Sequence, residues 1–78
     1  MALLLLHKLA MVDLPITLSV GDDVDGLRIL RMAGHVKAEI PPPVRTRAGY
    51  TQPPAVVLAI TPLGHHMLER FPLRLGTA

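Results

Sequence analysis

The chain has 78 residues, of which 50% are hydrophobic and 18% are charged, a composition typical of one small folded domain and not of a disordered chain. One Phe, one Tyr and no Trp exclude an aromatic core and argue against an aromatic platform for stacking nucleic-acid bases. The absence of Cys excludes disulfide bonds, thiolate metal sites and Cys nucleophiles.

The positive charge is confined to the middle of the chain. Residues 1–27 hold one Lys and four Asp, whereas residues 28–47 hold five basic residues and one Glu. Because attraction to a polyanion depends on where charge gathers, residues 28–47 are the region in which we expect contacts with an anionic partner.

Neither apolar stretch has the pattern of a targeting signal or membrane span. The run at residues 3–6 stops at His7 and Lys8 and has no basic segment before it, unlike a signal peptide. The longest uncharged run, residues 48–68, contains Pro53, Pro54 and Pro62, which a membrane helix would not carry. We therefore expect a cytoplasmic protein without a membrane partner.

Residues 2–12 are predicted to form a helix, because they lack Gly and Pro and consist largely of Leu, Ala, Met and Lys. Its apolar positions form two neighbouring stripes, and one stripe is enough for the core of a monomer. The second stripe predicts either a homodimer or a helix that its own domain covers completely. The residues expected at a dimer interface are Leu3, Leu6, Leu9 and Ala10.

A short strand or connector is predicted at residues 14–18, where Pro15 prevents simple helix continuation. A second helix is expected to begin near residue 20, because Ser19 and Asp22 have the spacing of a capping box. The further acids after Asp22 would lie near the positive end of the helix dipole and stabilise the helix.

This second helix has distinct buried and exposed faces. Spacing places Val24, Leu27 and Leu30 on the buried face, and Arg28 and Arg31 on the exposed face. Gly34 is expected to end the helix in the left-handed conformation.

Two strands are predicted to follow and to pair as a hairpin. Residues 35–40 alternate, with Val36, Ala38 and Ile40 inward, and residues 55–60 are rich in β-branched side chains. Their connection, residues 41–54, is unusually long and is stiffened by five prolines.

The chain closes with a third predicted helix that runs to about residue 71. Thr61 has the position of an N-cap and Pro62 that of the first helical residue. Gly64 is expected to weaken the helix by about 1 kcal/mol relative to Ala. The predicted apolar side consists of Leu63, Met67, Leu68 and Phe71, and residues 73–78 are expected to form a loosely held tail.

The order of these elements is that of a winged helix, an α+β fold, in a single domain at residues 1–78. The segment LRILRMAGHV at residues 27–36 resembles the end of a recognition helix and the Gly turn into the first wing strand. The segment LAITPLGHHML at residues 58–68 resembles the passage from the second wing strand into the closing helix of multiple-antibiotic-resistance (MarR) and PadR-type bacterial transcriptional regulators. Residues 41–54 would form the wing loop.

The resemblance implies a dimer that binds double-stranded DNA and controls transcription. Arg28 and Arg31 would contact bases or phosphates from the recognition helix, and Arg45 and Arg47 would anchor the wing. Lys37 and Tyr50 would support contacts with the DNA backbone.

The alternative is a winged-helix module that binds another protein, through the proline-rich wing, and has no DNA affinity. Three features favour it: an acidic start to the recognition helix, no complete helix before that helix, and a stiff wing. We predict no catalytic activity, because no nucleophile and base can be assigned. We also predict no cofactor and no metal site, since the adjacent His65 and His66 diverge on a helix.

Overall fold

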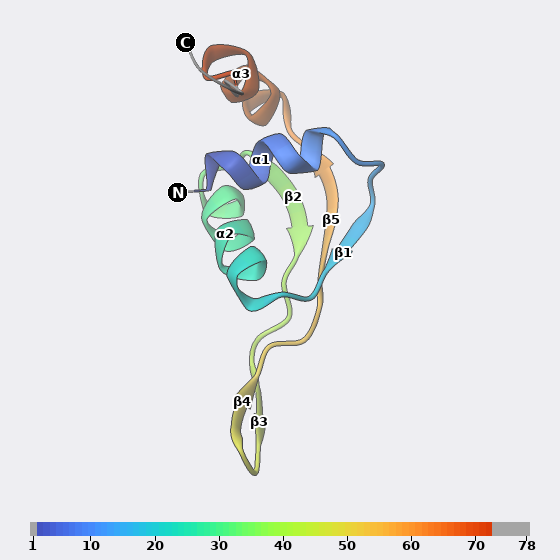
Figure 1. The fold of residues 1–78 in the computed structure, drawn as a ribbon, viewed down its shortest axis with the longest axis vertical. Coiled ribbons are helices and arrows are strands. Elements are labelled where there is room, and N and C mark those ends of the chain that lie inside the picture. The colour runs from blue at the N-terminus through green and yellow to red at the C-terminus, as the bar shows by residue number, and fades with distance from the viewer. Residues whose placement is uncertain (1, 73–78) are drawn as a thin grey trace, which may run out of the picture.

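The computed structural model describes residues 2–72 and shows a mixed α and β architecture, so the predicted α+β class is confirmed (Figure 1). The elements are α1 (Leu3–Ala10), β1 (Ile16–Leu18), α2 (Gly21–Met32), β2 (Val36–Glu39), β3 (Val44–Thr46), β4 (Gly49–Thr51), β5 (Ala55–Ile60) and α3 (Pro62–Arg70). The expected tail at residues 73–78 lies outside the described residues.

Three strands form an antiparallel sheet in the order β1-β5-β2. The predicted pairing of the strands on either side of residues 41–54 is confirmed, since β2 pairs with β5. The segment after Pro15 is a strand as well, and Thr17 of β1 lies opposite Val56 of β5. The register between β2 and β5 shifts between Lys37 and Ala38, an irregularity that strand periodicity did not predict.

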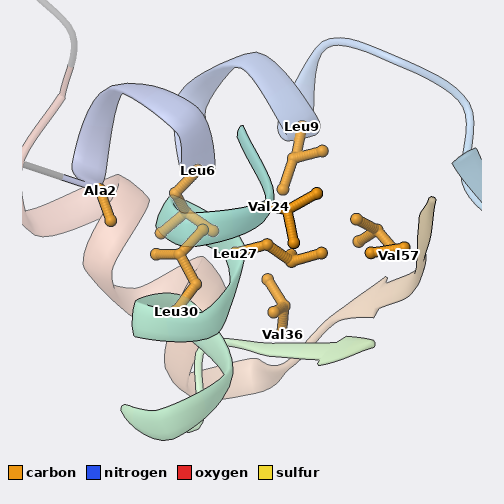
Figure 2. Close-up of a cluster of buried hydrophobic side chains, with 9 residues drawn as sticks. Ala2, Leu6, Leu9, Val24, Leu27, Leu30, Val36 and Val57 are labelled. Atoms are coloured by element: carbon orange, nitrogen blue, oxygen red, sulfur yellow. The ribbon is translucent and has the colours of Figure 1, made fainter. Parts of the chain in front are cut away.

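The core lies between this sheet and the helices α1 and α2. Figure 2 shows the side chains of α1 and α2 pointing toward one another and toward Val36 of β2 and Val57 of β5. The buried face predicted for α2 is confirmed. The buried apolar residues are Ala2, Leu6, Leu9, Val24, Leu27, Leu30, Val36, Ala55 and Val57.

The residues of α1 that were expected at a dimer interface divide into two groups. Leu6 and Leu9 are 0% and 2% exposed and pack in the core of this chain, so they offer no surface to a second copy. Leu3 is half-buried against that core, and Ala10 is exposed. Helical spacing alone could not separate these groups, because both apolar stripes carry similar side chains.

The prediction that Ser19 caps the start of α2 is wrong. The N-cap residue is Val20, and no side chain caps the helix there. The helix begins at Gly21, so Ser19 stands one residue before the cap position, where its hydroxyl does not serve as the N-cap acceptor.

The predicted end of α2 is confirmed. Gly34 has a φ of 78° and its N–H donates to the carbonyl of Arg31 at 3.0 Å, while the N–H of His35 donates to the carbonyl of Leu30 at 2.9 Å. These two bonds form a Schellman motif, which turns the chain sharply from α2 into β2.

The start of α3 is also confirmed, with Thr61 as N-cap and Pro62 in the first turn. The Thr61 hydroxyl accepts a hydrogen bond from the Gly64 N–H at 3.1 Å and donates one to the carbonyl oxygen of Gly34 at 2.5 Å. The N–H of Thr61 donates to the carbonyl oxygen of His35 at 3.0 Å. The N-cap of α3 is therefore bonded to the turn that ends α2.

The predicted apolar side of α3 is only partly buried. Met67 and Leu68 pack against the core, whereas Leu63 and Phe71 are 50% and 44% exposed. The end of α3 meets α1, where the His7 Nε2–H donates to the carbonyl oxygen of Phe71 at 2.7 Å. Burial of Leu63 and Phe71 depends on how α3 is set against α1, which periodicity does not determine.

Residues 41–54, which we call the arm, extend away from the helices at the end of the molecule opposite α3 (Figure 1). The arm contains β3 and β4, which pair as an antiparallel hairpin with Arg45 opposite Tyr50. The hairpin reverses at residues 46–49, where Gly49 has a φ of 124°. The predicted long connection is thus largely an ordered second sheet.

Candidate nucleic-acid interface

The end of the arm presents a basic surface to solvent. Arg45 and Arg47 are exposed, and Tyr50 is 75% exposed. The hairpin positions Arg45 and Tyr50 as cross-strand neighbours, with Arg47 in the turn. Residues 40–68 contain no Asp or Glu, so these guanidinium groups have no acid nearby in the sequence to neutralise them.

A second group of basic side chains lies on α2, on the flank that faces the base of the arm. Arg28, Arg31 and Met32 form one wall of a groove of about 620 Å³. Ile40 and residues 41–43 form the other wall. The structure therefore brings the predicted helix residues Arg28 and Arg31 together with the base of the arm.

Arg28 is also bonded within the molecule. Its Nη2 donates to the side-chain oxygen of Gln52, and its Nη1 lies 3.6 Å from a carboxylate oxygen of Asp25. The Gln52 side-chain amide then donates to the carbonyl oxygens of Pro41, at 2.7 Å, and Pro53, at 3.2 Å. We call these bonds the neck of the arm, because they join its two limbs to α2.

Asp25 lies beside Arg28, but the two acids before it lie on a different flank of α2. Asp22 and Asp23 line a groove between α1 and α2 together with Lys8. This groove is separate from the one that Arg28 and Arg31 line. Lys8, which lines the same groove, offsets part of the charge of these two carboxylates.

Lys37 is not part of either basic group. The preceding Val36 is buried in the core, and Lys37 is exposed on β2. Because side chains alternate along a strand, Lys37 projects from the sheet face opposite the helices. The structure therefore separates Lys37 from Arg28 and Arg31.

Apolar side chains occupy the outermost part of α2. Ile29 is 57% exposed and Met32 is 89% exposed, and Leu4 of α1, which lines the same groove as Ile29, is 49% exposed. This surface does not resemble the polar recognition surfaces of typical DNA-binding helices, and it could contact another protein.

Among residues 2–72, no three or more His, Asp or Glu side chains converge so as to hold a metal ion. Within the same residues, no helix combines the length and apolar character that crossing a bilayer requires.

Gln52 is the one participant in this region that sequence reasoning missed. A Gln next to a Pro pair reads as an ordinary loop residue, and its partners Arg28 and Pro41 are distant in sequence. No local pattern signals such a bond, because it depends on the way the chain returns past α2.

Comparison of the chain with protein-family models, with curated proteins and with solved structures finds no match.

Proposed function

We propose that this protein is a small winged-helix DNA-binding protein, in which α2 approaches the major groove of double-stranded DNA and the arm serves as the wing. The observation that carries the proposal is the groove between α2 and the arm, which Arg28 and Arg31 line and beyond which Arg45 and Arg47 extend. The strand order β1-β5-β2, with the arm inserted between β2 and β5, also supports it.

The chemistry of these side chains suits DNA. A guanidinium group stays charged at all physiological pH values and can bind two acceptors of a phosphate or a guanine edge at once. An exposed hairpin with Arg45 and Arg47 can follow a neighbouring groove, and the Tyr50 hydroxyl can donate to a phosphate oxygen. Arg31 on α2 and the two arm arginines are the contacts we expect to contribute most.

We further propose that the protein acts as a homodimer in the cytoplasm and regulates transcription. With Leu6 and Leu9 buried, the dimer surface would use Leu3 and Ala10 together with the exposed Leu4. Two copies would present two α2 helices, which would set the spacing of the DNA half-sites.

A second candidate function is protein binding without DNA affinity. The solvent-exposed side chains of Ile29 and Met32 on α2 favour it, because contact between apolar side chains and a phosphate backbone contributes little binding free energy. Three prolines at the base of the arm, which line the same groove as Met32, offer a preformed, rigid surface.

The experiment that separates the two functions is fluorescence anisotropy with a labelled duplex of mixed sequence, measured over a series of salt concentrations. DNA binding predicts affinity that falls as salt rises, and predicts that Arg45→Ala with Arg47→Ala lowers the slope of log affinity against log salt by about 2. Lys37→Ala is a control for general charge, since it removes a charge that lies outside both basic groups and should leave the slope unchanged. No binding at about 50 mM salt by a folded sample contradicts the DNA proposal and favours the protein-binding function.

A further inference from the structure

The direction of the arm relative to α2 is set by very few contacts. All six residues of β3 and β4 are exposed, so the hairpin itself does not pack into the core. An isolated two-stranded hairpin is marginally ordered in water. The contacts that hold the arm in place must therefore lie at its base.

The base of the arm holds the neck, in which Gln52 is the central residue. Gln52 accepts a hydrogen bond from Arg28 of α2 and donates to the carbonyl oxygens of Pro41 and Pro53. Gln52 lies in the second limb of the arm and its bond to Pro53 is local, so the bonds that join separate segments are those to Arg28 on α2 and to Pro41 in the first limb. A Gln suits this role because its amide group both accepts and donates.

Arg28 is held from its other side as well. Its Nη1 pairs with Asp25, one turn earlier on α2, while its Nη2 binds Gln52. A guanidinium has five N–H donors, so these partners do not occupy all of them, but a bidentate fork onto a guanine edge would compete with both. This distinguishes Arg28 from the exposed Arg31.

We propose that Arg28 and Gln52 are positioning residues. They fix the arm at one angle to α2, so that the arm and α2 can contact the same DNA duplex. The inference rests on the proposed function, and it assigns Arg28 to the arrangement of the binding surface instead of to base contact. Because the arm already has this angle in the free protein, DNA binding does not have to overcome the loss of conformational entropy that ordering a mobile arm would cause.

A variant that loosens the arm should change the affinity for DNA and its salt dependence differently from a variant that loses a phosphate contact. Gln52→Ala removes no charge and leaves Arg31, Arg45 and Arg47 in place, so the same phosphates are neutralised once the DNA is bound. We expect it to weaken DNA binding about tenfold while the salt slope stays unchanged. Arg45→Ala is expected to lower both the affinity and the slope.

The arm angle can be measured without DNA. The chain has no Cys, so Glu69→Cys, at an exposed position of α3, and Ala48→Cys at the end of the arm introduce two spin-label sites outside the proposed dimer surface. Pulsed electron paramagnetic resonance then gives the distribution of distances between the arm and the helices. We expect a narrow distribution in the parent protein, and a clearly broader one after Gln52→Ala.

Two further variants make the test specific. Arg28→Lys keeps the charge but offers a single ammonium group in place of the fork that pairs with Asp25 and Gln52, so we expect a broadened distribution as well. Thr51→Ala, at the exposed neighbouring position, is the matched control and should leave the distribution narrow.

The outcomes separate the two proposals. An equally narrow distribution in the parent protein and in Gln52→Ala overturns the positioning role, whatever the DNA affinity. A broadened distribution in Gln52→Ala, together with an absence of DNA binding by the parent protein, overturns the DNA function and leaves the neck as the element that orients the arm. A broadened distribution with weakened binding at constant salt slope supports both.

Discussion

The first turn of α3 lies directly on the backbone of His35, because Gly64 has no side chain to separate them. A Cβ placed at Gly64 would lie 2.1 Å from the His35 carbonyl oxygen and 2.7 Å from Cγ2 of Ile60. The same carbonyl oxygen accepts the Thr61 N–H at 3.0 Å. Gly64 therefore permits a close contact between the turn after α2 and the start of α3, and does not merely reduce helix stability.

Gly64→Ala is expected to destabilise the protein, in contrast to the usual effect of Gly→Ala in a helix. Helix propensity alone favours Ala by about 1 kcal/mol, but the new methyl group would overlap a backbone oxygen, and overpacking of this kind costs about 1–3 kcal/mol. The net loss in the free energy of unfolding, measured by urea denaturation, is expected to reach about 2 kcal/mol. Gly21→Ala is the control, because a Cβ there meets nothing within 4 Å. A Gly64→Ala protein as stable as the parent would contradict the close contact.

Thr61→Ala is expected to cost about 1–2 kcal/mol in the free energy of unfolding, because the hydroxyl both caps α3 and donates to the carbonyl of Gly34. Thr61→Ser retains the hydroxyl and should recover most of this stability. Thermal or urea unfolding of the two variants side by side measures the difference. Equal loss in both would show that the methyl group matters more than the two hydrogen bonds.

Leu6→Ala is expected to lower the free energy of unfolding by about 2–5 kcal/mol, because the Leu6 side chain is completely buried. Leu4→Ala, on the 49% exposed neighbour two residues earlier, should cost far less if the chain is monomeric. Urea unfolding at several protein concentrations tests both points. A cost for Leu4→Ala that increases with protein concentration would place Leu4 at a subunit interface.

Arg31→Ala is expected to weaken DNA binding and to lower the salt slope by about 1, since Arg31 is exposed on the flank of α2 that faces the arm. Lys37→Ala removes the same charge from the opposite face of the sheet and should leave the slope unchanged. Anisotropy titrations at matched salt concentrations measure both. Equal effects of the two variants would indicate general attraction by net charge and not a defined surface.

Local sequence patterns predicted the structure correctly wherever the groups that determine it are close neighbours in the chain. The alternation at residues 35–40, the Gly after α2 and the Thr-Pro pair before α3 each act through neighbouring backbone groups, and the structure agrees with all three. The spacing of Val24, Leu27 and Leu30 likewise identified the buried face of α2. The basic segment that holds both candidate DNA-binding groups was also visible in the sequence.

The remaining features depend on contacts between segments that are far apart in the chain. Which apolar stripe of α1 enters the core, and which side chains of α3 remain exposed, was decided by the packing of those helices against the rest of the fold. Gly64 looked like a weak point in a helix until the His35 backbone was found against it. Gln52 had no sequence signal, since its bonds to Arg28 and Pro41 exist only where the returning arm passes α2. Short-range hydrogen bonding and periodicity were thus determined by the sequence alone, while close approaches and cross-chain bonds required the tertiary structure, because their partners become neighbours only on folding.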